Sequence, residues 1–383
     1  MSSCPSAQLS QFAGLAPGRD REQKLYFEQK RLYTLQMEST IACQQDCVYC
    51  YAGSPEAPAD PLLGNDEIRR LLEAASRLEV RAIDWLGGDP LLRRDWAELM
   101  EHALSLGLVN NVWTSGLPLA DPAIAARVHE LTQGGFVSVH LDSIHPETYR
   151  KLHSRSGPER INTVIAGVDH LLALGKSPDQ MINCITYTAF QPPEDAIDTM
   201  RWWFDVKGLR TCLTMFNPAG AGAALKHLEP SVRDAEQVFT ARDAINFLDS
   251  SVSIACMDTD KFYCGTMATI THAGDVTPCS VIREGVGNVK ETPLEAILAQ
   301  HLDVLIHAQL HDPEGMPRPC NACDNNAHCW GCRASAFNYC GDANGLDPKC
   351  WIANKSCMCS RGGLFAAPPE RSEVPPEGAE GES

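Results

Sequence analysis

The sequence predicts an α/β protein in two parts: a parallel sheet covered by helices, then a smaller cysteine-rich segment. Strand and helix candidates alternate six times between residues 31 and 217, which is typical of a parallel sheet with its helices outside. Past about residue 255 helical periodicity thins, and Cys, Gly, Pro and Asn become more frequent. We therefore expect an N-terminal extension over 1–30, a first domain over 31–255, a second over 256–361 and a disordered tail over 362–383.

Short apolar segments rich in β-branched and aromatic residues are the strand candidates, and they cover 31–40, 80–88, 109–116, 136–142, 181–189 and 209–217. Apolar residues at helical spacing predict helices over 65–78, 94–107, 121–135, 146–153, 159–175 and 194–208. Asn65 is the expected N-cap of the first helix, Gly107 the stop of the second, and Asp121 with Pro122 the start of the third.

The charge of the chain argues against a nucleic-acid partner. The 383 residues include 32 Lys and Arg against 49 Asp and Glu, a formal net charge of −17, whereas nucleic acid would require a basic face. No N-terminal segment has the pattern of a signal peptide, and no apolar run approaches the length that spans a membrane. We expect a cytoplasmic protein that has no membrane partner.

The 17 cysteines are unevenly placed. Cys43, Cys47 and Cys50 follow the first strand directly with the spacing C-x3-C-x2-C, and eleven more fall between Cys256 and Cys359. In a reducing compartment, zinc or iron–sulfur clusters explain such usage better than disulfides. Three thiolates leave one iron of a [4Fe–4S] cluster open, and that iron can chelate S-adenosylmethionine and pass it an electron, which gives a 5′-deoxyadenosyl radical. A zinc site is the alternative.

A second motif, LGGDP, follows the second strand candidate and begins at Leu86. With the cysteine triplet and with Tyr49 before the third cysteine, it resembles the radical S-adenosylmethionine superfamily. The resemblance implies a partial (β/α)6 TIM-like barrel that binds a [4Fe–4S] cluster and S-adenosylmethionine. It also implies that Tyr49 lies in the S-adenosylmethionine site and that Gly87, Gly88 and Asp89 receive the methionyl amine. Asp89 stands where Glu is commoner in the family.

Three later segments resemble the same family more weakly. The resemblance implies that Thr114 ends the third strand in the cofactor site, that His140 and Asp142 lie near the ribose, and that Arg155 lies near the carboxylate. His140 could instead be a packed core histidine, and Arg155 a surface residue. The loop TMFNPAGAG, residues 214–222, is expected to lie against the adenine or simply to make a turn.

The C-terminal cysteines resemble the SPASM domain, which holds auxiliary [4Fe–4S] clusters in radical S-adenosylmethionine enzymes. This resemblance implies one cluster on Cys256, Cys264, Cys279 and Cys332. It implies a second cluster on Cys320, Cys323, Cys329 and Cys350. The spacing CWGC is one residue shorter than usual, and Cys340, Cys357 and Cys359 are left over, so the fourth ligands stay open. A zinc ribbon is the alternative.

Three functional hypotheses follow. The first is a radical oxidoreductase that abstracts a substrate hydrogen to mature or crosslink a peptide or protein. The second is a radical enzyme acting on a cofactor precursor such as a tetrapyrrole of a haem pathway, and the third is a non-enzymatic iron–sulfur electron carrier. Ser280 stands where sulfatase maturases carry Asp, which argues against that reaction. The resemblance implies a flavodoxin or ferredoxin as electron donor, and no catalytic side chain is assigned.

Overall fold

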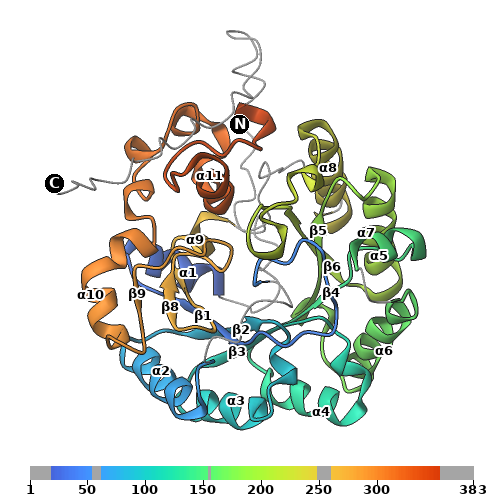
Figure 1. The fold of residues 1–383 in the computed structure, drawn as a ribbon, viewed down its shortest axis with the longest axis horizontal. Helices are drawn as coiled ribbons and strands as arrows, with labels where there is room; N and C mark the ends of the chain where they lie inside the picture. The colour runs from blue at the N-terminus through green and yellow to red at the C-terminus, as the bar shows by residue number, and fades with distance from the viewer. Residues whose placement is uncertain (1–18, 54–61, 154–156, 248–259, 354–383) are drawn as a thin grey trace, which may run out of the picture.

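The computed structural model describes residues 19–53, 62–153, 157–247 and 260–353. Its first half contains six strands that pair in parallel and in chain order: β1 (Thr34–Thr40), β2 (Ala82–Gly87), β3 (Val109–Thr114), β4 (Val137–His140), β5 (Met181–Tyr187) and β6 (Arg210–Met215). Helices follow the strands and lie around the outside of the sheet (Figure 1). The predicted α/β class with a partial barrel is confirmed.

The outer helices are α2 (Asn65–Arg77), α3 (Trp96–Ser105), α4 (Pro122–Leu131), α5 (Pro146–Leu152), α6 (Glu159–Ala173) and α7 (Pro193–Lys207). The predicted cap of α4 is present, because the Asp121 side chain accepts from the Ala123 backbone N–H. The predicted cap of α2 is wrong: Gly64 takes the N-cap, and the Glu67 carboxylate accepts from its N–H at 2.7 Å. Asn65 instead donates to the Asp95 carboxylate. An unpredicted helix, α8 (Val232–Phe247), follows β6.

The second half continues the same sheet. Strand β7 (Met267–Ile270) pairs in parallel with β1, and β8 (Asp275–Thr277) and β9 (Gly287–Asn288) add antiparallel beyond it. Three helices complete this half: α9 (Lys261–Cys264), α10 (Leu294–Leu305) and α11 (Arg333–Cys340). The boundary predicted at residue 255 and the predicted tail lie outside the described residues. No helix in the described part of the chain is long and apolar enough to cross a membrane.

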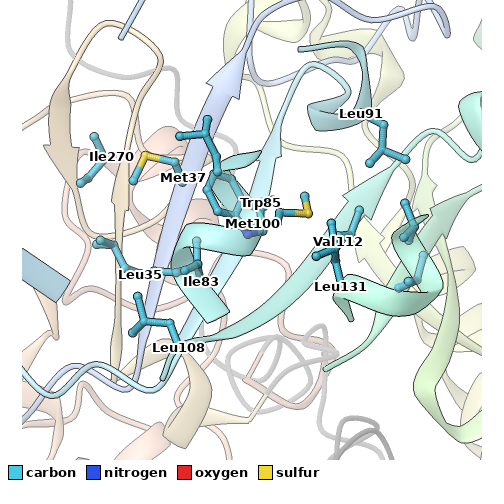
Figure 2. Packing of buried hydrophobic residues seen from close by; sticks show 14 of the residues in the cluster. Leu35, Met37, Ile83, Trp85, Leu91, Met100, Leu108, Val112, Leu131 and Ile270 are labelled. Carbon is cyan, nitrogen blue, oxygen red and sulfur yellow. The ribbon is translucent and has the colours of Figure 1, made fainter. Parts of the chain in front are cut away.

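The main core lies between the sheet and its outer helices. Alternate residues of neighbouring strands point the same way, so Leu35, Met37, Ile83, Trp85 and Val112 all face outward. They pack against helix residues that include Met100 and Leu131 (Figure 2). Each is at most 2% exposed. Burying one such side chain is worth about 1.5–3 kcal/mol, so this layer fixes the register on which the site depends.

The opposite face of the first strands is polar and equally buried. Asn111 donates to one oxygen of Asp84 at 2.6 Å, and the hydroxyl of Tyr263 donates to the other. Gln36 donates to the Tyr263 oxygen at 3.2 Å and accepts from Thr269 at 2.7 Å. Because Tyr263 and Thr269 come from α9 and β7, the second half completes the interior of the barrel beside β1.

Helix α1 (Arg19–Glu28) belongs with the second half, although the sequence analysis assigned residues 1–30 to an extension. It lies beside α9 in Figure 1. Phe27 is 6% exposed and stacks on His311 with ring centroids 3.8 Å apart. It also meets Phe262 edge-on at 5.1 Å and Trp330 at 5.8 Å. The helix therefore closes a small aromatic core on the C-terminal half.

Replacing Phe27 by Ala should lower the free energy of unfolding by about 3–5 kcal/mol, because it removes a buried ring from this core. The matched control is Leu25→Ala on the same helix, where the side chain is 47% exposed and the loss should stay within about 0.5 kcal/mol. Urea denaturation of both variants measures the difference. Equal losses would mean that α1 does not hold the C-terminal half.

Candidate functional site

Cys43, Cys47 and Cys50 lie in the loop that leaves the carboxyl end of β1, and we call residues 41–53 the cysteine loop. All three cysteines are free thiols, and Cys43 is exposed. The loop contains isolated turns and one bridge residue but no helix or strand of its own. Neighbouring strand ends must therefore satisfy its backbone groups.

The start of the loop lies against the carboxyl end of β2. Gly88 donates its N–H to the Thr40 carbonyl at 2.6 Å, and Asp89 donates to the Ala42 carbonyl at 2.7 Å. A Cβ on Gly87 would lie 2.4 Å from the Thr40 oxygen, and one on Gly88 would lie 2.2 Å from the Ala42 oxygen. Gly87 also has φ +123°, a backbone conformation that favours glycine. The two glycines are therefore required for the close approach of the loop to β2.

The middle of the loop lies against β4 and α5. Val48 donates its backbone N–H to the Leu152 carbonyl at 2.9 Å, and Cys47 forms an isolated antiparallel bridge with His153. The Nδ1 of His153 donates to the Gln45 carbonyl at 3.0 Å. Gln45 in turn donates its side-chain amide to the His140 carbonyl at 2.7 Å. These bonds hold the loop from both sides of Cys47.

The end of the loop lies against the segment after β6. Ala221 donates its N–H to the Cys50 carbonyl at 2.8 Å. Gly220 has φ +54°, and a Cβ there would lie 2.2 Å from the Tyr51 carbonyl oxygen. The loop 214–222, which was expected to face the adenine, thus lies in part against the backbone of the third cysteine. The glycine of its AGAG sequence was the signal for this close approach.

Two of the three thiols are poorly placed to ionise without a cation. Burial raises the pKa values of Cys47 and Cys50. A bound metal centre supplies the positive charge that thiolate ligands need. In the described residues, no three Cys, His, Asp or Glu side chains converge on one point, as a single zinc ion would require. Three cysteine thiols in one loop are the kind of donor that iron–sulfur clusters take, so the residues present fit such a cluster.

The side chains of Asp89 and Thr114 are hydrogen-bonded to each other. Asp89 is fully buried and accepts from the Thr114 hydroxyl at 2.8 Å and from the Ser115 N–H at 2.9 Å. The Ser115 hydroxyl and the Leu91 N–H complete its partners. No donor in the described part of the chain reaches the Gly88 carbonyl. Through these side-chain hydrogen bonds the motif joins the ends of β2 and β3. The Gly88 carbonyl remains as a backbone acceptor for an amine.

The side chains of His140 and Asp142 contact the side chain of Tyr49, which belongs to the cysteine loop. The Tyr49 hydroxyl donates to Asp142 and lies 2.8 Å from the Nε2 of His140. Asp142 is fully buried and Tyr49 is 6% exposed. Burial lowers the pKa of His140, but the carboxylate of Asp142 outweighs it and raises the pKa above its usual value. Arg155 lies outside the described residues.

The auxiliary cysteines fall into two neighbourhoods. Burial raises the pKa of Cys329 to about 12, with the nearby thiols of Cys350 and Cys320 adding to the rise, and Cys320 likewise senses Cys323. In the other neighbourhood, burial together with Cys332 raises the pKa of Cys279 to about 11. Cys279 thus lies near Cys332, and Cys329 near Cys350 and Cys320, whereas Cys264, predicted to join Cys279, packs in the same cluster as Cys320.

The remaining cysteines do not complete either set. Cys264 packs near Cys320 in the aromatic core. Cys340 is exposed at the end of α11. Cys256, Cys357 and Cys359 lie outside the described residues.

Two contacts join β1 and the cysteine loop to the segment around Cys279. Glu38 is fully buried near the end of β1, and both guanidinium nitrogens of Arg283 donate to it, one at 3.1 Å. Burial alone would raise the pKa of Glu38, but hydrogen bonds from His272 and Arg283 outweigh it and lower the pKa. Tyr51, directly after the third cysteine, lies beside Ser280: burial raises the pKa of its hydroxyl, and the Ser280 side chain partly offsets the rise. Sequence reasoning missed these partners because they are far apart along the chain.

Family comparisons define the class of protein. The radical SAM superfamily model matches residues 37–202, and the SPASM model, described as an iron–sulfur cluster-binding domain, matches residues 262–324. The chain is therefore a radical S-adenosylmethionine enzyme with a SPASM domain, which sets aside the hypothesis of a non-enzymatic carrier. Its first domain binds a [4Fe–4S] cluster and S-adenosylmethionine, and its SPASM domain binds auxiliary iron–sulfur clusters.

Individual relatives have several activities. A "Probable GTP 3′,8-cyclase" of Methanopyrus kandleri is 28% identical over 65% of this chain and 82% of its own. The "PqqA peptide cyclase" of Streptomyces rochei is 26% identical over 83% and 88%. The "AdoMet-dependent heme synthase" of Nitratidesulfovibrio vulgaris is 24% identical over 82% and 90%. The crystal structure of Streptococcus suis SuiB bound to S-adenosylmethionine shares the fold, with TM-score 0.60 and 14% identity over 87% and 81%.

Replacing Gly88 by Ala should displace the start of the cysteine loop, because the new Cβ would lie 2.2 Å from the Ala42 carbonyl oxygen. We expect loss of the S-adenosylmethionine-bound cluster signal in electron paramagnetic resonance spectra of the reduced protein. The matched control is Gly134→Ala, where a Cβ meets only Val109 at 3.9 Å. A Gly88→Ala protein with an unchanged spectrum would show that the loop does not need this close approach.

Proposed function

We propose that this enzyme oxidatively modifies a peptide or protein substrate, by abstracting a hydrogen atom at the barrel and passing the remaining electron toward the SPASM domain. The contacts of Glu38 with Arg283 and of Tyr51 with Ser280 carry this proposal. They place the segment of a predicted auxiliary ligand, Cys279, directly beside the loop of the first cluster. An electron released at the barrel thus has a short route into the second half.

We assign the roles of the residues as follows. Cys43, Cys47 and Cys50 hold the first cluster, and the Gly87–Asp89 backbone receives the amine of S-adenosylmethionine. When bound, this cofactor pair supplies a 5′-deoxyadenosyl radical that removes hydrogen from the substrate. The chain's own part is to hold the cysteine loop between the ends of β2, β4 and β6. The segments 31–255 and 256–361 serve as the catalytic and auxiliary parts, respectively.

The proposed auxiliary ligands are those that the SPASM resemblance implies. The nearness of Cys332 to Cys279, and of Cys350 and Cys320 to Cys329, supports part of each set. We assign Cys264, Cys279, Cys332 and Cys256 to one cluster. We assign Cys320, Cys323, Cys329 and Cys350 to the other. A small, strongly reducing protein such as a flavodoxin or ferredoxin is the proposed electron donor.

A peptide substrate is supported by relatives that span both halves of the chain. The relative named for PqqA peptide cyclisation aligns over 83% of this chain. SuiB, which shares the fold, has also been crystallised with its precursor peptide SuiA. The relative named as a GTP cyclase covers 65% of this chain. The wider alignment favours peptide modification.

A cofactor precursor such as a tetrapyrrole is the second candidate. The heme synthase relative covers 82% of this chain, nearly the same span as the peptide cyclase. Peptides encoded beside the gene and tetrapyrrole precursors can be tested in parallel for substrate-dependent 5′-deoxyadenosine release and for a change in product mass. If the enzyme converts a tetrapyrrole and converts no tested peptide, the second proposal replaces the first.

Replacing Cys43, Cys47 and Cys50 together by Ala should abolish 5′-deoxyadenosine formation under a strong reductant. Anaerobically reconstituted wild-type protein should hold about twelve irons, from three four-iron clusters, and the triple variant about eight. Iron and zinc analysis measures both values. A wild-type content near four irons with zinc present would contradict the auxiliary-cluster assignment.

Replacing Cys323 by Ala should leave 5′-deoxyadenosine formation intact but raise the ratio of deoxyadenosine to product. Cleavage of S-adenosylmethionine needs only the first cluster, whereas an oxidised product needs an exit for the electron. Because metal loss can unfold a small metal-binding domain, a wild-type melting profile must be shown first. A folded variant that keeps the wild-type ratio would assign the second auxiliary cluster a structural role.

A further inference from the structure

Asp142 is a buried carboxylate whose two oxygens are both occupied by protein groups. Oδ1 accepts from the Thr186 backbone N–H at 2.8 Å and lies 3.2 Å from the Nε2 of His140. Oδ2 accepts from the Tyr49 hydroxyl and lies 3.2 Å from the Nε2 of His153. The Asp142 side chain is 0% exposed. A ribose hydroxyl could reach it only after one of these partners had left.

The partners of Asp142 belong to the cysteine loop or touch it. Tyr49 lies between Cys47 and Cys50 in sequence, and its hydroxyl donates to Asp142. His153 donates to the Gln45 carbonyl, and its backbone bridges Cys47. The carboxylate is thus one contact away from the backbone on each side of the second cysteine.

The cost of burying the Asp142 carboxylate favours one fixed arrangement of the groups around it. Burial penalises a carboxylate anion heavily unless several donors surround it. Asp142 is fully buried, and the Thr186 N–H and the Tyr49 hydroxyl donate to its two oxygens, so the placement of the carboxylate depends on these donors. A loop tied to such a group has little freedom to shift.

We propose that Asp142 is a positioning residue for the first cluster: through Tyr49 and His153 it fixes the loop around Cys47 before S-adenosylmethionine binds. This replaces the expectation that its side chain meets the ribose. The inference rests on the cofactor and not on the peptide substrate, so failure of the substrate proposal would leave it intact. The two alternatives differ in one observable, the state of the cluster when S-adenosylmethionine is absent.

The test is Asp142→Asn in the full chain, reconstituted anaerobically. Asn keeps the side-chain volume and one accepting oxygen, which can serve the Thr186 N–H, but its amide nitrogen cannot accept from the Tyr49 hydroxyl, so that hydroxyl loses its acceptor. Without S-adenosylmethionine, the reduced variant should show at least a twofold loss of the first cluster's electron paramagnetic resonance signal, with an altered line shape. Subtracting the spectrum of the Cys43, Cys47 and Cys50 triple variant isolates that signal. Tyr49→Phe, which removes only the hydroxyl, should reproduce the altered line shape.

The matched control is Asp195→Asn. Asp195 is also a buried carboxylate, 8% exposed, but it accepts from Ser143 and Thr148, and within the described residues none of its hydrogen bonds reaches the cysteine loop. The Asp195→Asn substitution should lower the melting temperature and leave the cluster spectrum unchanged. If Asp142→Asn instead shows a wild-type spectrum that departs from wild type only after S-adenosylmethionine is added, Asp142 contacts the nucleoside. If Asp142→Asn does not fold, a wild-type spectrum in folded Tyr49→Phe overturns the proposal.

Discussion

The site depends on one constraint: a cysteine loop with no helix or strand of its own must have its backbone satisfied by other segments. The ends of β2, β4 and β6 supply partners through Gly88, His140 and Ala221, and the end of α5 adds His153. Parallel strands bring their carboxyl ends to one edge, so segments distant in sequence reach the same loop. The barrel thereby determines where three thiols stand, although none of them lies in a regular element.

Strand β1 carries this constraint into the second half of the chain. It pairs with β2 on one side and with β7 on the other, so both halves share one sheet. The ion pair of Glu38 with Arg283 is a second connection between the two halves, at the edge of the sheet where the cysteine loop begins. Displacing the second half would therefore leave a buried carboxylate without its partner, which costs several kcal/mol. The relative placement of the two cysteine-rich regions is built into the packing of β1.

Sequence patterns predicted the elements that repeat and missed those that depend on distant partners. The six strands and the cysteine triplet have local signals in apolar alternation and spacing. Strand β7 spans only Met267–Ile270, too short for such a signal, and α1 packs on residues about 300 positions away. Asp142 could be recognised as a site residue from its motif, but its partner Tyr49 is 93 positions earlier. Only the fold shows that the carboxylate faces the protein.

The charges at the edge of the sheet explain why loop and cofactor belong together. Two buried carboxylates, Glu38 and Asp142, lie there; Arg283 donates to Glu38, and Asp142 lies 3.2 Å from the Nε2 of His140. Three thiolates would add further negative charge, and burial raises the pKa values of Cys47 and Cys50. The iron of the cluster would supply the positive charge that the thiolates need. The loop is thus shaped in advance by the strand ends but becomes electrostatically complete only when the cluster is bound.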